Sequence, residues 1–437
     1  MTDGASPDRT KNYFRQVKGS VLFKGLAVGA SFFAVPLMIQ YLGNEQYGIW
    51  STLLSIMSWA VFFDFGIGNG LRNKLAESLA KNQVTEATGY ISSGYTWIGV
   101  ISAVLLVLVA VFSFLVPWQV VFNTNLLSNG KLQNAVLISA VFVLINFWLG
   151  LINQVLNAVQ KTSWVVFGQF LSNGLGLIVV HVLSRTTEAS LLLLVAGYGL
   201  SIVAANLLLS FGFYVIRGDL RPKLSYDRKH LYPLLSLGGQ FFVIQLAALV
   251  IFTTDKILIT QLFGPQYVAR YDVVFKLFSV ITLIHGLISA PLWSAYTDAY
   301  YKSDFKWMGV TLRKQLLIFV CVVAATVVLC FMAGSIIKVW VGPSVETPFL
   351  LILSVSVFLV VSIWNNIFAY FLNGVGEIRL QLYTAVAAML INIPVAIILV
   401  NDFGFGVDGV VWATCLSLSI FAIVGPIQVM SILARAK

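Results

Sequence analysis

Twelve long apolar runs dominate the sequence and decide what it can fold into. Each run reaches the roughly 20 residues that a helix needs to cross the hydrocarbon core of a bilayer. With 59% hydrophobic and only 10% charged residues, the chain has more apolar surface than one soluble core can bury. We therefore predict an all-α membrane protein of about twelve transmembrane helices. The runs cover 20–41, 47–70, 90–116, 132–157, 164–184, 189–215, 234–263, 267–293, 311–340, 348–373, 378–400 and 407–433.

Lysine and arginine are distributed unevenly among the polar segments between these runs. If the N-terminus lies in the cytoplasm, twenty of the 27 fall in cytoplasmic segments or at the run ends beside them, three fall likewise on the opposite side, and the other four are Lys24, Lys256, Arg270 and Lys276. Because cytoplasmic loops accumulate these residues, we predict that both termini are cytoplasmic. The net charge of +10 then follows from topology and contact with anionic lipids. No basic, aromatic patch in a soluble segment indicates nucleic-acid binding.

Two short passages recur in the two halves of the chain. IQYLGNEQYGIW from Ile39 matches ITQLFGPQYVARY from Ile259, and LNAVQK from Leu156 matches LNGVGE from Leu372. Each pair lies at an equivalent place in a six-helix half, so we predict two pseudo-symmetric bundles related by an axis along the membrane normal. The predicted parts are a cytoplasmic tail at 1–19, a bundle at 20–216, a basic linker at 217–230 and a bundle at 231–437.

The second run ends in an acidic and glycine-rich stretch. A charge at bilayer depth costs roughly 2.5 to 3.5 kcal/mol and usually faces water or a partner. Asp64, Gly68 and Arg72 follow one another at four-residue intervals, which predicts one helix face. Asp64 is either a coupling or gating carboxylate or a structural tie to Arg72 or the backbone. Gly66, Gly68 and Gly70 favour local unwinding or close backbone approach.

The seventh and eighth runs hold most of the remaining intramembrane charge. Asp255 and Lys256 lie in the seventh, and Arg270, Asp272 and Lys276 lie in the eighth. Asp272 and Lys276 are four residues apart and can neutralise each other, and Asp255 can do the same for a cation on a neighbouring helix. The two runs together still contain three cationic and only two acidic side chains. This surplus favours an anionic cargo such as a phosphate or diphosphate head group.

Two intramembrane cations also have a simpler explanation. Lys24 lies one to two turns inside the first run and Arg270 one turn inside the eighth, so either side chain can extend to the membrane surface. Lys256 and Lys276 lie too deep for that.

Common catalytic motifs are missing from the sequence. It has no GxxxxGK[ST] phosphate loop, no HExxH and no Cys/His cluster with metal-ligand spacing. The longest predicted external loop, Pro117 to Lys131, has no acidic residue that could act on a sugar acceptor. The sequence therefore disfavours an enzyme.

The segment from Pro36 to Glu77 resembles the opening hairpin of Wzx-type polysaccharide flippases. The likeness rests on the YLG.E.YGIW turn and on the D.GIG.GLRN stretch that closes the second run. These flippases belong to the multidrug/oligosaccharidyl-lipid/polysaccharide (MOP) exporter superfamily. The length, the twelve runs and the LN-x-V turns are similar to that family throughout the chain.

The resemblance implies a V-shaped pair of bundles around a cationic cavity in the bacterial inner membrane. Through it, an undecaprenyl-diphosphate-linked oligosaccharide would pass from the cytoplasmic to the periplasmic leaflet by alternating access, without a cofactor. Partners are the polyprenyl-diphosphate-linked oligosaccharide and membrane lipids, and the resemblance allows a polysaccharide polymerase and a chain-length regulator. The implied substrate-binding residues are Lys24, Lys256, Arg270 and Lys276, and the implied coupling or gating residues are Asp64, Asp255, Asp272 and Arg72.

Three questions remain open at the level of sequence. Coupling to entering H⁺ or Na⁺ is compatible with the acids but not established by them. A cation-coupled small-molecule exporter of the same superfamily is an alternative, although it would favour acids over cations in its cavity. The second alternative is a non-transporting scaffold for glycan assembly, whose function would tolerate removal of the intramembrane charges.

Overall fold

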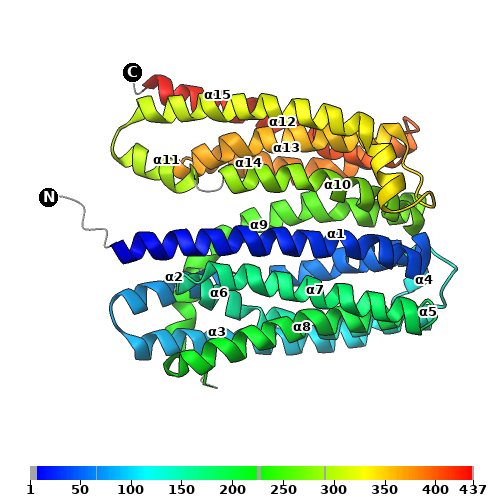
Figure 1. Ribbon diagram of the computed structural model, residues 1–437, viewed down its shortest axis with the longest axis horizontal. Coiled ribbons are helices and arrows are strands. Elements are labelled where there is room, and N and C mark those ends of the chain that lie inside the picture. The colour runs from blue at the N-terminus through cyan, green and yellow to red at the C-terminus, as the bar shows by residue number, and fades with distance from the viewer. Residues whose placement is uncertain (1–6, 65, 224–227, 290–291, 436–437) are drawn as a thin grey trace. The chain divides into compact units, whose positions relative to one another are not determined.

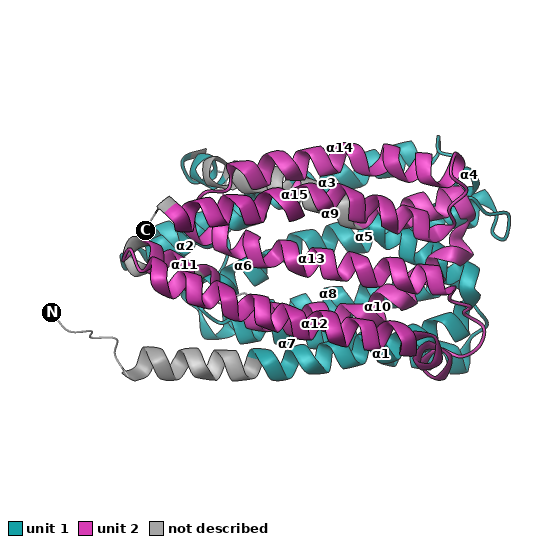
Figure 2. Cartoon of the chain, turned by 90° about the horizontal axis from the view of Figure 1, so that it is seen from above, with its two compact units in different colours: residues 1–245 teal, residues 246–437 magenta. Residues whose placement is uncertain are grey.

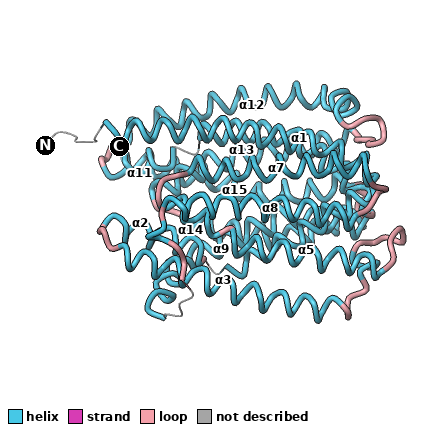
Figure 3. Tube along the Cα trace, turned by 60° about the horizontal axis from the view of Figure 1, so that its bottom comes forward, coloured by secondary structure: helices cyan, strands magenta, loops and turns pink. Residues whose placement is uncertain are grey.

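The computed structural model describes residues 7–64, 66–223, 228–289 and 292–435. Within these ranges, the side chains of 7–19, 61, 62, 64, 80, 228, 235–245, 247–252, 294, 298, 301 and 435 are not described. All regular structure in the described ranges is helical (Figures 1 and 3). This confirms the prediction of an all-α protein.

Fifteen α-helices and two 3₁₀ helices make up the described chain. Most boundaries fall within a few residues of the predicted runs, because long apolar segments end where polar, proline or glycine residues begin. The α-helices are α1 (Pro7–Ser58), α2 (Ile67–Ala80), α3 (Val84–Ser113), α4 (Trp118–Val121), α5 (Asn129–Leu149), α6 (Leu151–Ala158), α7 (Thr162–Thr186), α8 (Leu191–Ile216), α9 (Arg228–Phe263), α10 (Pro265–Ser289), α11 (Leu292–Tyr301), α12 (Phe305–Trp340), α13 (Phe349–Val375), α14 (Arg379–Asn401) and α15 (Val407–Arg435), and the 3₁₀ helices are η1 (Trp59–Asp64) and η2 (Gly218–Leu220).

The chain divides into two compact units, Met1–Gln245 and Leu246–Lys437 (Figure 2). In the first unit, α1 packs along α7, and α8 packs between α5 and α7. In the second unit, α13 contacts α10, α11, α12 and α15, while α14 packs on α15. The division into six-helix bundles at 20–216 and 231–437 stays a prediction.

The surface of both units is unusually apolar. In α12, the most hydrophobic window has a mean hydropathy of 3.0, yet only 17% of it is buried inside the protein. Leu317, Val320 and Phe331 of this helix are all more than half exposed. Contiguous exposed apolar surface of this extent is incompatible with water, so a bilayer must cover it. Ten helical segments of the described chain are long and apolar enough to cross a membrane.

The first two predicted runs are not separated by a loop in the structure. The first run and the beginning of the second lie in α1, of which the 39 residues Ser20–Ser58 count as a single candidate span. At about 1.5 Å per residue it is far longer than the hydrocarbon core. Gly43 interrupts it with a φ of 74° and a ψ of 168°, which are not helical angles. A count of twelve spans, and the location of the termini, stay predictions.

The matched passages of the two halves have matching backbone conformations. Gly43 and Gly264 are the turn glycines of the first pair, and both have positive φ, at 74° and 105°. Gln160 and Gly376 occupy the same place in the second pair, with φ of 59° and 84°. The following amide donates to the carbonyl of the matched leucine in both, over 2.8 Å at Leu156 and 3.1 Å at Leu372. The matched sequence passages thus mark similar backbone turns in the two halves.

Candidate functional site

A cluster of three charged side chains lies on the hairpin of α9 and α10. The Nζ atom of Lys256 is 2.6 Å from Oδ1 of Asp272, and the two side chains are only 24% and 16% exposed. Lys276, one turn after Asp272, interacts electrostatically with both partners. The turn at Gly264 folds α10 back along α9 and brings residues sixteen positions apart in the sequence into contact.

This cluster carries a net positive charge. Two ammonium groups and one carboxylate lie together here, so these three partly buried side chains sum to a formal charge of +1. Taking such a charge out of water is costly unless an opposite charge or water compensates it. An anion that approached Lys256 and Lys276 would make charge-assisted hydrogen bonds there. The cluster is therefore suited to hold an anionic group.

Asp255 belongs to a different environment from its neighbour Lys256. Its side chain is 3% exposed, and its Oδ2 atom accepts a hydrogen bond from the Tyr271 hydroxyl at 3.2 Å. Its Oδ1 atom accepts from the Thr414 hydroxyl at 3.1 Å, and Nδ2 of Asn392 donates to the same hydroxyl at 2.9 Å. Adjacent helical residues point about 100° apart, so one helix serves two sites.

The Asp255 network gathers oxygen atoms from four helices. The carboxylate comes from α9, the phenol from α10, the amide from α14 and the threonine hydroxyl from α15. The amide oxygen of Asn392 is buried and accepts no hydrogen bond in the described structure. A buried carbonyl oxygen without a donor is costly, and together with a carboxylate and a hydroxyl it forms a ligand set typical of a hard cation.

Sequence reasoning singled out Asp255 but missed its partners. Tyr271, Thr414 and Asn392 are uncharged residues inside apolar runs, and such residues commonly pack or bond to their own helix. The only signal available was their polarity at membrane depth.

The two shallower cations lie outside the cluster. Lys24 donates a hydrogen bond from Nζ to Oε1 of Gln169 on α7, at 2.9 Å. Arg270 places its guanidinium 4.8 Å from the ring centroid of Tyr267, one turn earlier on α10. Each side chain thus has a local partner, and their predicted role in binding substrate stays a prediction.

The predicted common face of Asp64, Gly68 and Arg72 is wrong. Asp64 ends η1, Gly66 takes a left-handed conformation with a φ of 79°, and α2 begins only at Ile67. No continuous helix therefore connects Asp64 to Arg72, whose side chain is exposed. The side chain of Asp64 lies outside the described residues. The glycines do act as predicted, since the segment unwinds here and Gly70 approaches the backbone of Leu234 in α9.

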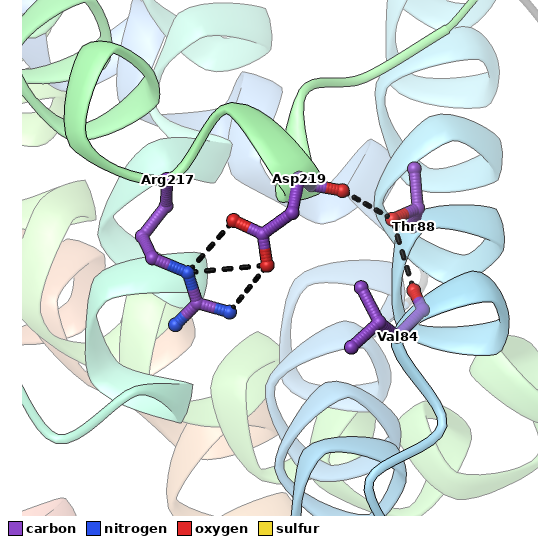
Figure 4. A network of polar contacts seen from close by, with 4 residues as sticks. All are labelled: Val84, Thr88, Arg217 and Asp219. Carbon is purple, nitrogen blue, oxygen red and sulfur yellow. Dashed lines mark hydrogen bonds and ion pairs between the residues drawn. The ribbon is translucent and has the colours of Figure 1, made fainter.

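The predicted basic linker is tied to the start of α3. Figure 4 shows Arg217 and Asp219 in a two-point ion pair, with Nη2 2.7 Å from Oδ2 and Nε 2.9 Å from Oδ1. The arginine lowers the pKa of the Asp219 carboxyl, which keeps it charged. The Thr88 hydroxyl lies 3.0 Å from the backbone oxygens of both Asp219 and Val84. This corner therefore anchors the chain as it leaves α8.

The start of α9 is held on α3 in a similar way. Oε1 of Glu86 lies 3.3 Å from Nζ of Lys229, and its Oε2 lies 2.9 Å from Nε2 of His230. The ring of His230 also packs edge-on against Tyr90. Both ends of the predicted linker therefore contact the first unit.

An all-helical fold with extensive lipid-facing surface and a buried charged site defines a multi-pass membrane transporter. Residues 17–294 match the family model of polysaccharide biosynthesis proteins, and residues 241–398 match that of MatE proteins. The chain belongs to the polysaccharide biosynthesis protein family, within the MOP superfamily. This confirms the resemblance inferred from the opening hairpin, and it agrees with the prediction that the protein is no enzyme.

Curated relatives support the same assignment. A candidate O-antigen export protein of Yersinia pseudotuberculosis is 22% identical over 358 residues, which are 81% of each chain. A candidate O-antigen transporter of Salmonella typhimurium is 21% identical over 367 residues, which are 83% of each chain.

Solved structures of transporters share the fold. An inward-facing multidrug resistance MATE family transporter of the MOP superfamily matches with a TM-score of 0.80 at 14% identity, over 95% of this chain and 98% of that one. The lipid II flippase MurJ, in an inward closed conformation, matches with a TM-score of 0.74 at 15% identity, over 94% and 87%.

Proposed function

We propose that this protein flips a polyprenyl-diphosphate-linked oligosaccharide, such as an O-antigen repeat unit, from the cytoplasmic to the periplasmic leaflet of the bacterial inner membrane. It does so by alternating access, and it supplies the glycan to a polysaccharide polymerase and a chain-length regulator. The names of the curated relatives support this substrate class. The observation that carries the proposal is the grouping of two lysines, Lys256 and Lys276, with Asp272 at membrane depth.

The charged cluster fits the most difficult part of this cargo. A diphosphate cannot cross hydrocarbon unaided, because an unpaired charge in a low-dielectric medium is very costly. Lys256 and Lys276 can bind its oxygens in place of water while the polyprenyl tail stays in the lipid. Asp272 keeps the two ammonium groups together when no anion is bound.

Complementation of a flippase-null strain tests the assignment of the lysines. Lys256→Ala and Lys276→Ala are each expected to lower surface glycan about tenfold or more, since each removes a charge-assisted hydrogen bond to the diphosphate, worth about 1.5–3 kcal/mol. Lys24→Ala and Arg270→Ala are expected to cause smaller losses, because those cations have local partners. Surface glycan and protein level are measured together.

Lys314→Ala is the matched control, because Lys314 is an exposed lysine on α12 outside the cluster. It should retain normal surface glycan. Full activity of both Lys256→Ala and Lys276→Ala at normal protein level would contradict the diphosphate assignment.

Inward movement of Na⁺ through the Asp255 network would couple transport to an ion gradient. The network supplies a buried carboxylate, hydroxyl groups and an amide oxygen, and the membrane potential contributes about 2.3 kcal/mol per 100 mV to each entering positive charge. A proton could neutralise Asp255, but it would leave the amide oxygen of Asn392 without a partner. The network therefore favours Na⁺ over H⁺.

Thermal unfolding in sodium and choline chloride tests this ion site at equal ionic strength and fixed pH. Sodium is expected to raise the midpoint of unfolding by about 3 °C or more, because a ligand that binds only the folded state stabilises it. Asp255→Asn should abolish the difference, whereas Asp402→Asn, an exposed acid after α14, should keep it. If transport in proteoliposomes responds to a pH gradient and sodium has no effect, the coupling ion is a proton.

A further inference from the structure

A polar groove lies within the first unit. Its volume is about 360 Å³, within the range of small-molecule sites, which extends from about 300 to 1,000 Å³. The groove runs between the segment that leads from α1 into α2 and the segment that leads from α5 into α6. Its lining includes Ser58, Gly68, Asn69, Asn146, Phe147 and Gln154.

Interrupted helices form both walls of this groove. On one side, η1 and the left-handed Gly66 separate α1 from α2 inside a predicted span. On the other side, α5 ends at Leu149 and α6 begins at Leu151 within one candidate span, and Gly150 between them keeps helical angles. Non-helical backbone at membrane depth is tolerated where it lines a water-filled cavity, and substrate sites of transporters are commonly built from such broken helices.

The amide side chains of Asn69, Asn146 and Gln154 give the groove its polarity. Asn206 of α8 donates from Nδ2 to Oδ1 of Asn146 at 2.6 Å, and Asn153 in turn donates to Oδ1 of Asn206 at 3.4 Å. This chain orients Asn146 so that its own Nδ2 donor is not consumed. The side-chain amides of Asn69 and Gln154 line the groove without a hydrogen-bond partner in the described structure. Donors and acceptors are thus available to a ligand.

The lining chemistry selects a neutral ligand rich in hydroxyl groups. None of the residues that line the groove is charged. An amide offers both a donor and an acceptor, which matches a pair of neighbouring hydroxyls. Phe147 and aliphatic neighbours such as Met57 and Leu151 offer apolar surface to the C–H face of a sugar ring.

We propose that this groove binds an uncharged sugar residue of the lipid-linked cargo. The inference rests on the proposed function and extends it, because it assigns recognition of the sugar, and not of the diphosphate, to the amides of the first unit. Asn69 and Gln154 then determine specificity for the sugar and leave the affinity for the diphosphate unchanged.

Binding of two lipids to the full-length protein in nanodiscs tests this division. One probe is undecaprenyl diphosphate without a sugar, and the other is undecaprenyl diphosphate that carries a neutral disaccharide. The wild type is expected to bind the glycolipid more tightly. Asn69→Leu and Gln154→Met, which keep side-chain size, should each weaken glycolipid binding about fivefold to tenfold and leave binding of the bare lipid unchanged. Asn401→Leu, at the exposed end of α14, is the matched control and should bind both lipids normally.

The outcomes separate this inference from the proposed function. Equal wild-type affinity for the two lipids, or unchanged glycolipid binding by both groove variants, would overturn the sugar site and leave the flippase proposal intact. If the variants bind both lipids equally more weakly, the amides have a structural role, and this result would also overturn the sugar site. Failure of the wild type to bind either lipid would overturn both proposals. Protein level and the unfolding midpoint of each variant show that the fold is preserved.

Discussion

Asp272→Leu is expected to lower the free energy of unfolding by about 2–3 kcal/mol and to reduce the level of folded protein. The carboxylate lies 2.6 Å from the ammonium group of Lys256, and its removal takes this attractive neighbour away from both lysines. Removing one partner of a buried ion pair typically costs about 3–5 kcal/mol. We expect a smaller effect because both side chains are partly exposed. Thermal unfolding of the purified protein in detergent measures it.

A double variant separates this stabilising role from transport. Lys256→Met combined with Asp272→Leu removes both charges, and replacing an ion pair by apolar side chains is often nearly neutral for stability. The remaining Lys276 loses both the attraction of Asp272 and the repulsion of Lys256. The double variant should therefore unfold near the wild-type temperature yet fail to export glycan. A double variant as unstable as Asp272→Leu would show that packing, and not the unpaired charge, causes the loss.

Gly70→Ala is expected to destabilise the first unit by about 2–3 kcal/mol. A Cβ atom at Gly70 would lie 2.2 Å from the carbonyl oxygen of Leu234 and 2.8 Å from its Cα atom. These are backbone atoms of α9 and cannot turn aside as a flexible side chain would. Overpacking of this kind costs about 1–3 kcal/mol, and sometimes more. The unfolding midpoint and the amount of monodisperse protein after extraction measure the effect.

Gly286→Ala is the matched control for this prediction. A Cβ atom at Gly286 meets no heavy atom within 4 Å, and the residue lies inside α10. Alanine is a better helix former than glycine by about 1 kcal/mol, so this variant should be neutral or slightly more stable. A similar loss of stability in both variants would mean that the contact between α2 and α9 does not explain the effect at Gly70.

The sequence predicted the helices better than it predicted the site. The expected runs at 164–184 and 407–433 became α7 and α15 with ends shifted by about two residues. The four-residue spacing of Asp64, Gly68 and Arg72 failed as evidence for a shared face, because it assumed a continuous helix. Gly66 breaks that helix. Charged residues were easy to single out in the apolar runs. Asn69, Gln154 and Asn392 carry no charge, so they cannot be told from the other polar residues of these runs by sequence.

Sequence alone determined the bilayer as the solvent of this protein, its all-helical fold and its family. Each depends on hydrophobicity over about 20 consecutive residues or on motifs within one segment, so each is encoded locally. The tertiary structure alone decided which polar groups meet. Asp255 is bonded to Thr414, 159 positions away, and Asn146 is oriented by Asn206, 60 positions away. Such contacts depend on how helices pack together, because the apolar periodicity that builds a helix does not specify which neighbour its polar residues will face.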